Sequence, residues 1–97
     1  MFNNPRYITK GINDTVPFAL QLLMWNLIDT MNISHKDCLQ VFELSEDDGK
    51  QKIIHKQEQP AYEKTYSLNS ANTSFLYAKI FVIDDHTHST MLLASEY

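Results

Sequence analysis

The sequence has one cysteine, two glycines and three prolines among its 97 residues, and each shortage excludes a class of protein. Cys38 alone cannot form an internal disulfide, whereas a domain this small in an oxidising compartment usually carries several bridges. With only Gly11 and Gly49, the chain cannot build the glycine-rich loops that hold nucleotide phosphates. Low glycine and proline content also argues against disorder. We therefore expect a folded protein in a reducing compartment, with no cofactor.

Long apolar runs and clustered positive charge are missing as well. No stretch approaches the ~20 apolar residues that cross a bilayer, and the start of the chain, Met1 to Arg6, lacks the pattern of an export signal. The formal net charge is -4 at pH 7, which disfavours nucleic acid and anionic lipid because both attract clustered Lys and Arg. We expect a cytoplasmic protein that does not bind membranes.

What is present is enough apolar material for one core. The apolar fraction is 43%, so residues 1–97 should form a single domain. Alternating and helical spacings of apolar residues predict the following elements in order: a strand Arg6–Ile12, a helix Pro17–Met31, and strands Cys38–Leu44, Lys50–Gln57, Tyr62–Leu68, Phe75–Ile83 and Thr90–Ala94. The predicted class is α+β, with one amphipathic helix packed on a mainly antiparallel sheet of about six strands, ordered as strand, helix and β-meander.

Two local signals refine this expectation. Asp48 and Gly49 lie between extended segments and predict a tight hairpin turn, because glycine accepts the positive φ that such turns need. The segment Phe75–Ile83 is apolar on both alternating faces except at Lys79, which predicts an interior position in the sheet. Asn69–Ser74 should form the loop before it.

Five segments in the same order carry a resemblance to a known family. They are Arg6–Gly11, the helix residues Leu20–Leu22 with Met24 and Trp25, Leu39–Leu44, His55 with Gln57, Glu58, Pro60 and Tyr62, and Ala78–Asp85 continuing through Ser89–Leu93. The chain resembles short uncharacterised proteins of staphylococci, enterococci and related Gram-positive bacteria, which are catalogued as a domain of unknown function. The resemblance implies a bacterial, cytoplasmic, single-domain protein. It supplies no catalytic residue.

The turn before the last strand contains the residue types of a metal site. His86 and His88 follow Asp84 and Asp85, and imidazoles with carboxylates are ligands that zinc accepts. Side chains two residues apart share a face only in an extended segment, so a solvated turn is the simpler interpretation. A small metal protein or enzyme that uses the His86/His88 turn remains the alternative function.

Other chemistries have weaker signals. Cys38 has no neighbouring basic cluster or helix start that would activate its thiol, so we expect it to be buried and inert. Glu43, Glu58 and Glu63 with His55 have the groups for acid–base catalysis, but their separation cannot be inferred from sequence. We lean against an enzyme.

A third alternative is a single-stranded nucleic-acid binder. Tyr62, Lys64 and Tyr66 interleave aromatic and basic side chains along one predicted strand, as in sheets on which bases stack. The acidic balance of the chain opposes this function, and tyrosines on a half-buried strand more often cover the sheet.

The leading hypothesis is a binding or regulatory module that acts through protein contacts. Phe18, Leu22 and Trp25 recur at four- and three-residue spacing, on the side of the helix opposite Leu20, Leu23, Leu27 and Met31. One sheet can cover only one of these stripes, so the stripe of Phe18, Leu22 and Trp25 needs another cover. The C-terminal tail, the loop after Leu68 or a partner could provide it. We expect a partner interface there, in its simplest form a homodimer.

Overall fold

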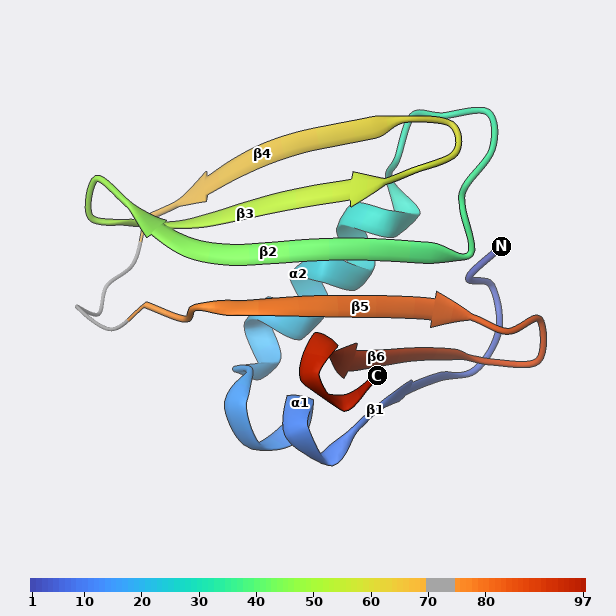
Figure 1. The fold of residues 1–97 in the computed structure, drawn as a ribbon, viewed down its shortest axis with the longest axis horizontal. Helices are drawn as coiled ribbons and strands as arrows, with labels where there is room; N and C mark the ends of the chain where they lie inside the picture. Colours follow the sequence, from blue (N-terminus) through green and yellow to red (C-terminus); the bar gives the residue numbers. More distant parts are fainter. Residues whose placement is uncertain (70–74) are drawn as a thin grey trace.

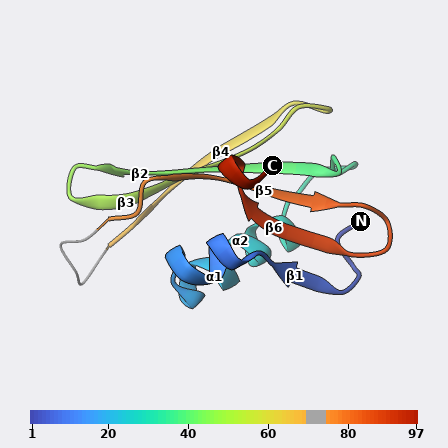
Figure 2. The ribbon, with the colours of Figure 1, turned by 60° about the horizontal axis from the view of Figure 1, so that its bottom comes forward.

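The computed structural model describes residues 1–69 and 75–97, and these form a six-stranded sheet with two helices packed on one face (Figures 1 and 2). The elements are β1 (Arg6–Ile8), α1 (Lys10–Thr15), α2 (Phe18–Asp29), β2 (Leu39–Asp47), β3 (Lys50–Gln57), β4 (Tyr62–Leu68), β5 (Ala78–Asp84), β6 (Ser89–Leu93) and a 3-10 turn η1 (Ala94–Glu96). The α+β class is confirmed. From residue 70 to residue 74, the predicted loop lies outside the described residues.

The strand order is β1-β6-β5-β2-β3-β4, with every pair antiparallel except the parallel pair of β1 and β6. The predicted meander is therefore correct for β2, β3 and β4 and wrong for β5, which crosses to the other side of β2 (Figure 1). This crossing joins apolar strands side by side, with Phe42 of β2 opposite Ile80 of β5. The interior position predicted for the apolar strand near the C-terminus is confirmed.

The N-terminal strand ends earlier than predicted. It stops at Ile8, and the Thr9 hydroxyl accepts a hydrogen bond from the Ile12 backbone N–H, which caps the start of α1. Ile12 is completely buried in this helix. The prediction of a strand through Ile12 was wrong because Thr9 caps a helix at this point. The hydrogen bond that forms the cap cannot be inferred from the alternation of apolar residues.

Replacing Thr9 with Ala should lower the free energy of unfolding by about 1 kcal/mol, because the Ile12 N–H loses its side-chain acceptor. Urea unfolding followed by circular dichroism measures the change. Thr9→Ser keeps the hydroxyl and should remain close to the parent. Equal stability of Thr9→Ala and the parent would contradict the assigned cap.

The hairpin between β2 and β3 forms where the sequence predicts it. Asp48 and Gly49 both have positive φ, at 54° and 74°, as a two-residue hairpin of strongly twisted strands requires. The Glu46 carboxylate also accepts the Gly49 N–H at 2.9 Å. This turn fixes the register in which Val41 lies opposite Lys56 and Glu43 opposite Ile54.

The core lies between the sheet and α2, and alternate residues of the strands point into it. Its fully or almost fully buried apolar side chains are Phe2, Ile12, Val16, Met24, Trp25, Leu27, Ile28, Phe42, Leu44, Ile53, Ile80, Val82 and Met91. Phe2 comes from the segment before β1, so the N-terminus contributes to the core. Because side chains alternate along a strand, the neighbours of these residues point to the opposite face of the sheet.

Candidate interaction surface

One face of the sheet is turned away from both helices, and Figure 1 looks onto it while Figure 2 shows both helices on the other side. Over this face the described chain places the C-terminal turn, where the Tyr97 ring meets the Phe81 ring edge-on at 5.5 Å. We call this surface the open face. Its half-buried apolar side chains are Leu39 and Val41 of β2, Ile54 of β3, Phe81 and Ile83 of β5, and Leu92 of β6.

Four charged side chains of alternating sign cross the open face from β5 to β4. In order they are Lys79, Glu43, Lys56 and Glu63, and we call them the charge row. Glu43 lies opposite Lys79 across one strand pair, and its carboxylate binds the Lys56 ammonium at 2.9 Å. The hydrogen bond to Glu43 raises the pKa of Lys56, so this amine stays charged. The open face is thus apolar towards β6 and charged towards β4.

A groove of about 450 Å³ lies over the charged part of this face. The four members of the charge row line it, together with Glu58 from the turn that follows β3. Carboxylates and ammonium groups alternate along its floor. Such a surface is suited to polar contacts with another chain, because each charge has an opposite charge beside it and remains accessible.

The predicted helical stripe is only partly exposed. Phe18 and Leu22 are 69% and 52% exposed, but Trp25 is 8% exposed. The Arg6 guanidinium lies 4.7 Å from the centre of the Trp25 ring and pairs with Asp29 at the end of α2. Trp25 is therefore buried rather than exposed on this stripe, because the Arg6 side chain of β1, the edge strand of the sheet, lies over its ring. The interface role of Phe18 and Leu22 stays a prediction.

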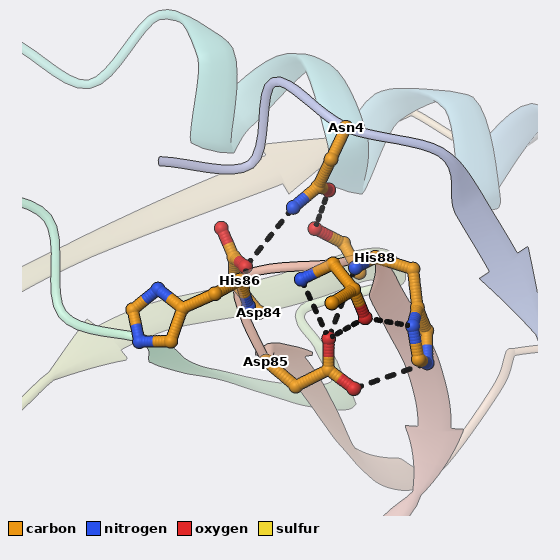
Figure 3. A network of polar contacts seen from close by, with 7 residues as sticks. Asn4, Asp84, Asp85, His86 and His88 are labelled. Atoms are coloured by element: carbon orange, nitrogen blue, oxygen red, sulfur yellow. Dashed lines mark hydrogen bonds and ion pairs between the residues drawn. The ribbon is translucent and has the colours of Figure 1, made fainter.

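The acidic residues of the His86/His88 turn, which the sequence offered as metal ligands, accept hydrogen bonds from backbone N–H groups. Asp84 is buried, and its carboxylate accepts the N–H groups of Phe2 at 2.6 Å and His86 at 2.7 Å and the Asn4 amide at 3.1 Å (Figure 3). Burial raises the pKa of the Asp84 carboxyl, and these hydrogen bonds together bring the pKa below its ordinary value. Asp84 thereby joins the N-terminal segment to the end of β5.

Asp85 closes the turn itself. Its carboxylate accepts the backbone N–H groups of His88 and Thr87 and the Thr87 hydroxyl, and these bonds lower the pKa of Asp85 to about 2. The His88 ring lies 3.3 Å from Asp85, while the His86 ring points away from it (Figure 3). In residues 1–69 and 75–97, no three His, Cys, Asp or Glu side chains are grouped to hold a metal.

The remaining predicted groups are distributed over both faces of the sheet. Cys38 is exposed just before β2, so its predicted burial was wrong. His55 is buried on the helix side of β3, whereas Glu43 and Glu63 lie on the open face, which separates the predicted acid–base set.

The three residues of the nucleic-acid alternative lie on the helix side of β4, not on the open face. The Tyr62 ring meets the buried His55 ring edge-on at 5.3 Å, while Lys64 is exposed. Burial, helped by a hydrogen bond to Tyr66, raises the pKa of Tyr62 to about 12. Tyr62 thus helps to cover the sheet.

A network of buried amides was missed at the sequence level. The His55 ring stacks on Phe42 at 4.3 Å, and its Nε2 lies 2.7 Å from the Gln40 side-chain oxygen. The Gln40 amide donates to Gln57, which also accepts the backbone N–H of Asp37. These hydrogen bonds join the segment between α2 and β2 to strand β3. The sequence signal for this network was that Gln40, His55 and Gln57 occupy positions of β2 and β3 whose side chains alternate into the core.

The fold and these surfaces define a small α+β domain with one open sheet face. A family model described as "Staphylococcal protein of unknown function (DUF960)" matches residues 5–96, and the chain belongs to this family. A crystal structure of a protein of unknown function from Enterococcus faecalis has the same fold, with a TM-score of 0.82 and 26% sequence identity over 98% of this chain and 92% of that one.

No curated protein matches the chain. Among the described residues, no helix has the length and apolar character that a membrane crossing requires. The predicted resemblance to staphylococcal and enterococcal proteins is confirmed.

Proposed function

We propose that the protein is a small cytoplasmic binding module that acts through contacts with another protein chain. The observation that carries this proposal is the open face: apolar side chains on β2, β3, β5 and β6 are only half-buried because both helices pack on the other side. Contact with a second chain would remove this area from water, and the charge row would orient the two chains.

The exposed part of α2 is a second candidate surface for contact with another protein chain. Phe18 and Leu22 are adjacent on the helix, but the burial of Trp25 leaves them as a small patch. The open face offers a larger set of apolar side chains together with ordered charges, which favours it as the contact surface.

Site-specific photo-crosslinking in the producing cells separates these surfaces. A benzophenone-bearing phenylalanine at Phe81 probes the open face, and the same replacement at Phe18 probes the helix. We expect an adduct of defined mass from Phe81 and little from Phe18, because the reactive group must lie within a protein contact. Mass spectrometry identifies the attached chain.

Adducts from Phe18 alone would move the interface to α2. Absence of adducts from both positions, with the labelled proteins still folded by circular dichroism, would contradict the proposed function. The same label at Asn26, an exposed polar position of α2, measures random capture.

A further inference from the structure

We propose that a second copy of this chain docks on the open face, so that the open faces of the two copies meet. A two-fold axis relates the copies; it lies between the two faces and runs parallel to the line from Val41 to Ile54. The inference rests on the proposed function and names its partner. It follows from how the strand register arranges four side chains on β2 and β3.

These four side chains occupy the corners of a small rectangle. Val41 pairs with Lys56 across the two strands, and Glu43 pairs with Ile54. The ion pair of Glu43 and Lys56, at 2.9 Å, is therefore one diagonal of the rectangle, and the apolar pair of Val41 and Ile54 is the other. A half-turn about the apolar diagonal brings each end of the charged diagonal close to the position of the other end.

This half-turn makes the charge row complementary to itself. Read from β5 to β4, the row is positive, negative, positive, negative, and its reversal places each charge opposite the other sign. Glu43 of one copy lies against Lys56 of the other, and Lys79 lies against Glu63. An axis along the row would instead place every charge against its own copy, which is repulsive. The alternation thus selects one arrangement.

The apolar side chains match under the same operation. Val41, Ile54 and, on the extension of the same line, Ile83 of β5 lie on the axis and meet their own copies, while Leu39 of β2 lies over Phe81 of β5 in the second copy. The molecule extends 38 by 28 Å along its two longer axes, and Figure 1 looks onto this broad side. Such a side can supply the roughly 800 Å² per partner that stable interfaces bury.

Two charge reversals test the arrangement between copies. In sedimentation equilibrium we expect the parent to form dimers, and Glu43→Lys or Lys56→Glu alone to weaken self-association by about tenfold or more, because each places like charges together. Mixing the two variants in equal amounts should restore the dimer mass. In the mixed dimer, positions 43 and 56 are both positive in one chain and both negative in the other. Each like-charged pair therefore lies within one chain, and opposite charges meet between the chains.

The mixture is decisive because both variants still lack the ion pair within the chain, so its repair cannot explain recovery. Lys10→Glu breaks the exposed ion pair with Asp14 on α1 and serves as the matched control, with the parent's mass expected. A mixture that stays monomeric overturns the two-fold arrangement.

A monomeric parent overturns self-association. If such a parent still gives Phe81 adducts with a different protein, the proposed function stands and only the identity of the partner changes. If it gives no adducts, both proposals fall.

Discussion

Acidification from about pH 7 to about pH 5 should lower the free energy of unfolding by about 2 kcal/mol, and His55 should account for this loss. Burial lowers the pKa of His55 from 6.5 to about 4. Between these two pKa values the unfolded chain binds a proton that the folded chain does not, so stability rises with pH across this window. Below pH 4 the full loss reaches roughly 3 kcal/mol.

The surroundings of His55 explain why its charged form is disfavoured. Its ring is completely buried between Phe42 and Tyr62, and its Nε2 faces the Gln40 oxygen. The Nδ1 atom has no hydrogen-bond partner among the described residues, so a second proton there would find no acceptor. Tyr62 supplies no negative charge, because its pKa is raised to about 12.

Urea unfolding at several pH values measures the effect, and His55→Gln should flatten it. Glutamine can donate to Gln40 in the same way but does not titrate, so the variant's stability should change little between pH 7 and pH 5 even if its absolute value is lower. His35→Gln changes an exposed ring and should keep the parent's slope. A parent without this slope would contradict the assigned burial of a neutral imidazole, as would a His55→Gln variant that retains it.

The parts of the fold that depend on neighbouring residues could be predicted from the sequence. The turn at Asp48 and Gly49 needs two residues that accept positive φ, and β3 begins and ends at the predicted residues. The interior position of β5 followed from its apolar run. The crossing of β5 past β2 was not predictable in this way, because it depends on pairing between residues distant in sequence.

The open face was missed for a related reason. Val41, Ile54 and Phe81 belong to strands that the sequence predicts, but only the placement of both helices on the other side shows that these three residues face outward. Trp25 was misjudged in the opposite sense, since its cover is the Arg6 side chain from β1. Local spacing indicates which residues share a face of an element. It does not indicate what packs on that face.

Replacing Asp84 with Ala should lower the free energy of unfolding by about 3 kcal/mol and release the N-terminal segment. Asp84 is 4% exposed and its carboxylate accepts the Phe2 N–H at 2.6 Å, so removal of the carboxylate leaves a buried donor unpaired. The Asn4 amide and the His86 N–H lose the same acceptor. Because Phe2 is completely buried in the core, loosening its backbone also weakens the packing of the core.

The neighbouring carboxylate provides the matched control. Asp85→Ala removes hydrogen bonds of the same kind, to Thr87 and His88, but on an exposed turn where water replaces them. We expect its stability to stay much closer to the parent's, and the Phe2 amide to exchange rapidly with solvent deuterium only in the Asp84 variant. Similar losses from both substitutions would mean that the turn as a whole, rather than the buried contact with Phe2, holds the N-terminus on the sheet.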